Sequence, residues 1–85
     1  MHEAQYKDLV FGKENKTCIV NTRPRSYEVV YIKDNKPKND LLMIVRAIGP
    51  LRRELENVAT TEGKKIENGV FGIVVNSIES IEFKD

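Results

Sequence analysis

The sequence predicts one α+β domain, mostly β, in which about five strands form a small, partly closed β-barrel with one short helix at Pro50–Thr60. Short β-branched and apolar segments recur along a chain of 85 residues, which is too short for two separate cores. Gly49-Pro50 interrupts this pattern and is followed by apolar residues at helical spacing. Strands this short and numerous usually curl into a barrel, because closure removes their exposed edges. Residues 1–85 are therefore expected to form a single domain.

The first elements come from residues 6–23. Tyr6–Phe11 carries enough apolar residues for a short helix or an opening strand, and Gly12–Lys16 is predicted to be a polar turn. Thr17–Arg23 is rich in β-branched residues and is predicted to be a strand. It stops at Pro24, which lacks a backbone donor and suits the end of a strand.

The clearest strand is Tyr27–Lys33, whose alternation places Tyr27, Val29 and Tyr31 on one face. The opposite face is also partly apolar, so we expect this strand inside the sheet. A polar loop over Lys33–Asp40 follows it.

The second half supplies the remaining elements. Leu41–Ile48 is apolar at nearly every position, as expected of a strand covered on both faces. The predicted helix comes next, and its apolar stripe consists of Leu51, Leu55, Val58 and Ala59. Two closing strands, Val70–Val75 and Ile78–Phe83, are separated by a bend at Asn76-Ser77.

Cysteine and histidine are too scarce for disulfide or metal chemistry. Cys18 is the single cysteine and His2 the single histidine, so no disulfide, metal site or cofactor is expected. The first residues are polar, unlike a signal peptide, and the longest apolar run, Leu41–Val45, is too short to cross a membrane. The default expectation is a cytoplasmic protein without a membrane partner.

No set of residues indicates an enzyme. Nucleophilic catalysis by Cys18 would need a nearby base, and His2 lies close to the terminus. Residues 69–72 contain two glycines but lack the lysine and the following helix of a phosphate-binding loop. Glu54 and Glu56 are two positions apart on the predicted helix and face different directions. The sequence therefore favours a non-enzymatic role and leaves catalysis open.

Basic residues are concentrated in one part of the chain. Residues 13–38 contain seven Lys or Arg and three acidic residues, whereas residues 39–85 contain six basic and eight acidic residues. A basic segment in a chain of net charge +1 indicates a polyanion-binding face. The alternative is that these side chains only maintain solubility and protect strand edges.

We therefore predict a small nucleic-acid or nucleotide-binding module that uses the basic strand and loop face of Lys16–Lys38. Tyr27 and Tyr31 share one strand face beside these charges, where they would stack the bases of RNA or single-stranded DNA. The alternative is that at least one tyrosine is a core residue whose hydroxyl reaches the rim. The predicted nucleic-acid-binding residues are Lys16, Arg23, Arg25, Tyr27, Tyr31, Lys33, Lys36 and Lys38.

A non-catalytic protein-binding adaptor or inhibitor is the alternative function. Small domains without catalytic residues often dock on a larger partner, as many proteins of phages and mobile elements do, and that partner would be a host protein. An exposed β edge is one candidate surface. The charged candidates are the acidic C-terminal stretch with Glu79, Glu82 and Asp85 and the helix face with Arg52, Arg53 and Glu56.

Several short motifs follow one another in an order shared with a known family. They are Lys16-Thr17, Asn21-Thr22-Arg23-Pro24, the Tyr27–Lys33 strand, the Leu41–Ile48 strand, the Pro50–Thr60 helix and Phe71-Gly72-Ile73 through Ile81. This order resembles that of small PUA-like barrels of the ASCH class, in which a Lys-Thr pair leads into a strand with an acidic-x-Arg signature. The resemblance covers most of the chain and implies a barrel fold.

The same resemblance implies a chemistry. Some members of the class hydrolyse modified nucleosides with a lysine, a threonine hydroxyl and a glutamate, which would correspond here to Lys16 and a carboxylate such as Glu54. The chain departs from that pattern, because Asn21 stands where the class often carries Glu and two extra residues precede Arg23. The threonine position would then fall near residues 18–20. Binding is therefore favoured over hydrolysis.

Overall fold

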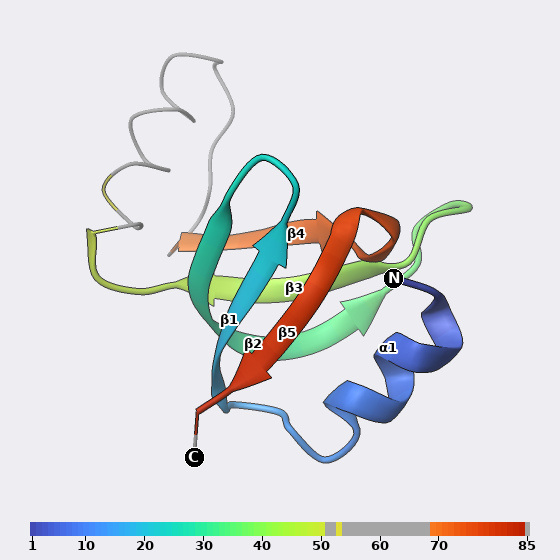
Figure 1. Ribbon diagram of the computed structural model, residues 1–85, viewed down its shortest axis with the longest axis horizontal. Coiled ribbons are helices and arrows are strands. Elements are labelled where there is room, and N and C mark those ends of the chain that lie inside the picture. The colour runs from blue at the N-terminus through green and yellow to red at the C-terminus, as the bar shows by residue number, and fades with distance from the viewer. Residues whose placement is uncertain (51–52, 54–68, 85) are drawn as a thin grey trace.

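A computed structural model of the protein describes residues 1–50, 53 and 69–84 (Figure 1). Its strands form one antiparallel sheet in the order β4-β3-β2-β1-β5, so β4 and β5 are the two edges. All five predicted strands are present, and their ends differ from the predicted ones by a few residues. The elements are α1 (Glu3–Val10), β1 (Thr17–Thr22), β2 (Ser26–Asn35), β3 (Leu42–Ala47), β4 (Val70–Val74), the 3-10 helix η2 (Val75–Ser77) and β5 (Ile78–Phe83).

The sheet curls back on itself because its two edge strands are consecutive in the chain. β4 and β5 lie at opposite ends of the strand order, yet only the three residues of η2 connect them. The two edges therefore approach one another at this turn (Figure 1), although no strand pairing joins them within the described residues. The fold is the mostly β, partly closed barrel that the sequence predicts.

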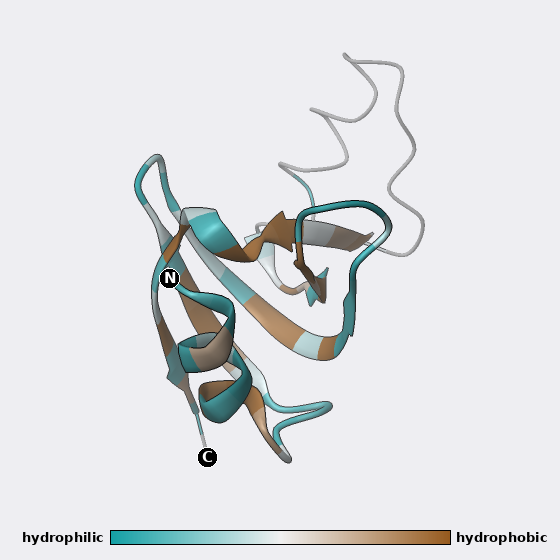
Figure 2. Ribbon diagram, turned by 90° about the vertical axis from the view of Figure 1, so that its right-hand side faces the viewer, coloured by the Kyte–Doolittle hydropathy of each residue, from teal (hydrophilic) through white to brown (hydrophobic). Residues whose placement is uncertain are grey.

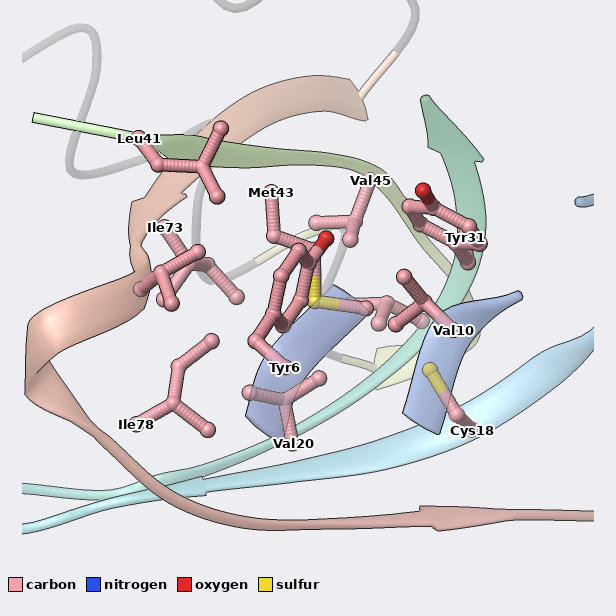
Figure 3. Close-up of a cluster of buried hydrophobic side chains, with 12 residues drawn as sticks. Tyr6, Val10, Cys18, Val20, Tyr31, Leu41, Met43, Val45, Ile73 and Ile78 are labelled. Atoms are coloured by element: carbon pink, nitrogen blue, oxygen red, sulfur yellow. The ribbon is translucent and has the colours of Figure 1, made fainter. Parts of the chain in front are cut away.

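α1 packs its apolar side against the inside of the curled sheet. Tyr6 and Val10 lie one helical turn apart, and both are buried. Figure 3 shows them pointing into the same core as Val20 and Met43. Figure 2 shows α1 beside the sheet, with hydrophobic residues concentrated in the strands and hydrophilic residues in the loops.

Two helix predictions have different outcomes. The sequence leaves Tyr6–Phe11 open between a helix and a strand, and the structure places Tyr6–Val10 in a helix that begins earlier, at Glu3, with Phe11 just beyond its end. In this helix Tyr6 and Val10 lie on one face and are both buried, although a strand would also place residues four positions apart on one face. The helix predicted over Pro50–Thr60 lies almost entirely outside the described residues.

The core is mostly aliphatic and also contains two tyrosines and the cysteine Cys18. Its thiol is fully buried, and burial raises its pKa from 9.0 to about 11. Cys18 is therefore a protonated packing residue in β1 and not an activated nucleophile. The core residues are Tyr6, Val10, Cys18, Val20, Val29, Tyr31, Leu41, Met43, Val45, Ile73, Val75 and Ile78.

β2 is the longest strand and pairs with two neighbouring strands, β1 and β3. Its first half pairs with β1, and its pairing with β3 continues to Asn35. The register with β3 shifts between Tyr31 and Lys33, which leaves Ile32 as an extra residue. Such a bulge bends a strand, and a bent central strand lets a five-stranded sheet curl. The predicted loop at Lys33–Asp40 begins three residues later, at Lys36, because β2 continues to Asn35.

Candidate nucleic-acid interface

The turn between β1 and β2 holds two exposed arginines in a rigid frame. The Thr22 amide donates to the Arg25 carbonyl at 2.9 Å, so the connection is a tight one with Arg23 and Pro24 at its tip. The Thr22 hydroxyl donates to the same carbonyl at 2.7 Å and accepts a longer bond from the Arg25 amide at 3.4 Å. Pro24 restricts the backbone further. Arg23 and Arg25 are both exposed at this turn.

Two aromatic rings lie beside the turn and contact one another. The rings of Tyr27 and Phe71 have centroids 5.6 Å apart with 53° between their planes. The Arg25 guanidinium lies over the Tyr27 ring, 5.8 Å from its centroid, which is within the range of a cation–π contact. Both rings are half-buried. This arginine–tyrosine–phenylalanine row is called the Arg25–Tyr27–Phe71 shelf below.

The strand register explains why these rings meet. Tyr27 begins the inward-facing row of β2, and Phe71 begins that of β4, on the other side of β3. In the register Ala47 lies opposite Val29 and Phe71 lies opposite Val45, so Tyr27 and Phe71 meet diagonally across Ala47, which is buried and small. Because Ala47 has only a methyl group, the two rings approach one another across it. The shelf therefore lies at one end of the barrel, where inward side chains begin to reach solvent.

Polar but uncharged side chains cover the neighbouring outer surface. The Ser26 hydroxyl donates to the side-chain carbonyl of Asn21, and the Asn21 amide donates to the Ser80 hydroxyl at 2.9 Å. This row crosses β2, β1 and β5 on exposed positions. Glu28, further along β2, forms a salt bridge with Lys84 at 3.2 Å, which offsets its negative charge.

Tyr31 does not belong to this surface. Its side chain is 3 % exposed, and its hydroxyl donates to Asp34 Oδ1 at 2.8 Å. The hydroxyl of the fully buried Tyr6 donates to the same oxygen. Burial, and then the contact with Asp34, raise the pKa of both tyrosines above the ordinary value. A base cannot stack on Tyr31, so of the two predicted stacking residues Tyr31 is the core residue.

The predicted lysines lie away from the shelf. Lys33 is on the last part of β2, and Lys36 and Lys38 are in the loop beyond it, at the opposite end of the strand from Arg25. Lys36 forms a salt bridge with Glu3 of α1 at 3.2 Å. Lys16 precedes β1 and is exposed. The eight predicted residues therefore divide into separate groups, because a strand of ten residues separates the two ends of β2.

Phe71 is the residue of the shelf that was not predicted from the sequence. The alternation of Val70–Val75 places Phe71 and Ile73 on the inner face, which is a signal for a buried residue. Nothing local in the sequence indicates that Phe71 meets Tyr27, because the contact spans two strands with a third between them. The contact depends on the strand order alone.

Three further observations on the described residues concern metal binding, membrane-spanning helices and the residues suggested for catalysis. Within residues 1–50, 53 and 69–84, no group of three or more His, Cys, Asp or Glu side chains could hold a metal ion. No helix among these residues is long and apolar enough to span a membrane. Lys16 is exposed at the start of β1, and Glu54, its suggested catalytic partner, lies outside the described residues.

No protein-family model matches the chain, and no curated protein or solved structure matches it either. The resemblance to the ASCH class therefore stays a prediction.

Proposed function

We propose that the protein binds single-stranded nucleic acid, RNA or DNA, through the Arg25–Tyr27–Phe71 shelf and the adjacent Arg23. The observation that supports this function best is the position of the Arg25 guanidinium over the ring of Tyr27, which itself packs on Phe71. Cations beside half-exposed aromatic rings are what an unpaired nucleotide requires, because its phosphate is anionic and its base has two π faces.

Each side chain of the site would contact the part of the nucleotide that suits its chemistry. The two arginines at the rigid turn would contact phosphates, and Arg25 would also stack against a base with its planar guanidinium. The exposed part of the Tyr27 ring would carry the base, while Phe71 supports the ring from behind. Base stacking on an aromatic side chain contributes about 1–3 kcal/mol per base and tolerates any sequence. We therefore infer binding with little sequence preference.

Salt dependence tests the electrostatic part of this function. We expect fluorescence anisotropy with a labelled oligouridylate to show an affinity that falls as salt rises. The double variant Arg23→Ala/Arg25→Ala should bind more weakly and should reduce the salt slope by about 0.7 for each phosphate that is no longer neutralised. Arg46→Ala is the matched control, because Arg46 is an exposed arginine on β3, outside the shelf. Absence of binding by the natural protein at low salt contradicts the proposal, as does an equal loss in the control.

Stacking is tested separately. Tyr27→Leu retains an apolar side chain of similar burial but removes the aromatic face, so we expect weaker binding with an unchanged salt slope. Tyr27→Phe should bind normally, because the ring remains. If Tyr27→Leu binds as well as the natural protein, no base stacks on this ring.

A further inference from the structure

The two edges of the sheet differ in how they are protected against pairing with other chains. The β5 edge carries exposed Glu79 and Glu82, and its register with β1 shifts near Thr22. Charges and irregular pairing are the usual means of blocking an edge. The β4 edge, Val70–Val74, has no charge, no proline and a regular register with β3. Within the residues that the structure describes, β4 is therefore an edge strand without these protections.

The outer surface beside the second half of β4 is also aliphatic, whereas exposed Arg46 lies opposite Val70 at the start of the strand. Val74 is 38 % exposed, and Leu42 and Ile44 on the neighbouring strand β3 are half-buried. Gly72 has no side chain to cover them, and a Cβ at this position would lie 3.3 Å from Leu42 Cδ1 and 3.4 Å from Ile44 Cδ1. These two methyl groups therefore extend toward the free edge. The result is an apolar surface that continues up to the edge of the sheet.

The backbone register shows which groups of β4 face outward. The Val75 amide donates to the Leu41 carbonyl at 3.0 Å, so Val75 directs its backbone groups toward β3. In an antiparallel pair this direction alternates along the strand. Ile73 and Phe71 therefore also face β3, and the N–H and C=O groups of Val70, Gly72 and Val74 face the free edge. Among the described residues, no strand pairs with this edge.

The sequence of β4 is nearly the same in both directions. Val70-Phe71-Gly72-Ile73-Val74 has Gly72 at its centre, a large apolar residue on each side and a valine at each end. In an antiparallel pair with a second copy, Gly72 would lie opposite the partner's Gly72, and Val70 opposite the partner's Val74. These are the three residues whose backbone groups face the edge. The same register therefore pairs the outward-facing backbone groups of the two copies and places valine opposite valine. Both conditions are needed for a two-fold interface.

From these observations we propose that the protein forms a symmetric homodimer by antiparallel pairing of β4 with β4 of a second copy. Leu42 and Ile44 of the two copies extend the contact over the outer surface. The interface is short and stands at the small end of specific interfaces, so we expect a reversible monomer–dimer equilibrium. This inference is independent of nucleic-acid binding, because β4 contributes only Phe71, on its inner face, to the shelf.

Sedimentation velocity over micromolar to millimolar concentrations tests the dimer. The average mass of the natural protein should rise toward twice the 9.8 kDa of one chain. Val74→Lys places a charge opposite an apolar residue at the interface, and it should remain monomeric. Ser80→Lys is the matched control, because it adds the same charge to an exposed position of the β5 edge, and it should dimerise normally. A natural protein that stays monomeric, or a Val74→Lys variant that still dimerises, overturns the proposal.

Hydrogen exchange of the natural protein provides a second test that does not depend on a variant folding. The amides of Val70, Gly72 and Val74 should exchange more slowly as the concentration rises, because the second copy occupies them. The amides of Phe71 and Ile73 already bond to β3 and should change less. Equal concentration dependence at all five positions, or none at any of them, would rule out β4 pairing.

Discussion

Asp34 accepts hydrogen bonds from two buried tyrosine hydroxyls that come from different elements. Tyr6 belongs to α1 and Tyr31 to β2, and both hydroxyls donate to the same carboxylate oxygen. The half-buried carboxylate therefore joins the helix to the sheet. This arrangement also removes Tyr31 from any nucleic-acid surface.

Replacing Asp34 by Ala should destabilise the fold. Two buried hydroxyls would lose their acceptor, and each unsatisfied group costs about 1–3 kcal/mol. Urea denaturation would show the loss as a lower midpoint with an unchanged slope. Asp40→Ala, at an exposed position in the loop after β2, is the control and should change stability little. In a double-mutant cycle with Tyr6→Phe the two effects should be less than additive; full additivity would contradict a direct interaction.

The buried thiol of Cys18 makes stability depend on pH in the alkaline range. The pKa of Cys18 is raised from 9.0 to about 11 in the folded protein, so the folded chain keeps its proton while the unfolded chain loses it. The contribution is fully present below pH 9.0 and is lost as the pH rises toward about 11, at a slope of about 1.4 kcal/mol per pH unit. Tyr6 and Tyr31 add to this loss above pH 10.0, because their pKa values are raised as well.

The contribution of Cys18 can be isolated with Cys18→Ala. Below pH 9.0 this variant should be less stable, because it leaves a cavity. Its free energy of unfolding should nevertheless fall less steeply than that of the natural protein between pH 9.0 and 10.0, before the tyrosines titrate. Parallel curves for the two proteins would show that the thiol does not titrate on unfolding.

The β1–β2 turn is the element on which the proposed site depends. Its geometry rests on the Thr22 hydroxyl, which bonds to both the carbonyl and the amide of Arg25. The Thr22 side chain is almost fully buried, at 8 % exposure, so water does not readily replace these bonds. The turn therefore presents Arg23 and Arg25 in one fixed arrangement.

Thr22→Val should loosen this turn while keeping the side-chain shape. We expect a loss of stability of about 0.5–1.5 kcal/mol, since the Arg25 carbonyl loses one of its two donors. Nucleic-acid affinity should fall in parallel, because the arginines are no longer held in place. Thr22→Ser retains the hydroxyl and should restore both properties. If Thr22→Val is unstable but binds as tightly as the natural protein, the turn does not position the arginines.

In the molecule as a whole, the turn arginines and the loop lysines among the predicted nucleic-acid-binding residues lie at opposite ends of β2. The ten residues of this bent strand have a path length of roughly 30 Å along the backbone, at about 3.3 Å per residue. Arg23 and Arg25 precede the strand, whereas Lys36 and Lys38 follow it. A short ligand cannot contact both ends at once.

This separation predicts a dependence on the length of the nucleic acid. A single-stranded binding domain covers roughly 4–16 nucleotides. With a tetranucleotide, Lys38→Ala should bind like the natural protein, whereas Arg25→Ala should bind more weakly. With an oligonucleotide near the upper limit, both variants should bind more weakly and both should show a smaller salt slope. Equal effects of Lys38→Ala at both lengths would mean that the two groups act as one site.

Much of the fold could be predicted from local patterns. The strands follow from alternating apolar residues such as Val29 and Tyr31, because a pleated strand exposes every second side chain to the core. The partial closure follows from the number and shortness of the strands. The α1 helix was ambiguous, since eight residues hold too few apolar positions to separate a period of two from a period of 3.6.

The candidate site was only partly predictable. Arg23, Arg25 and Tyr27 were identified because they are close in sequence and chemically suited to nucleic acid. Tyr31 was grouped with them because it shares the strand face of Tyr27, but that face turns into the core after the first residues of β2. The burial of a residue on such a face depends on how far along the strand the core extends, which local alternation does not specify.

Local patterns in the chain are sufficient to indicate which segments become strands, where the chain turns at Pro24 and which residues carry charge. These properties depend on neighbours within a few positions. Only the tertiary structure decided that Phe71 meets Tyr27, that Asp34 joins Tyr6 to Tyr31 and that β4 is an unprotected edge. Each of these depends on the strand order β4-β3-β2-β1-β5, and that order is set by packing between residues far apart in the chain.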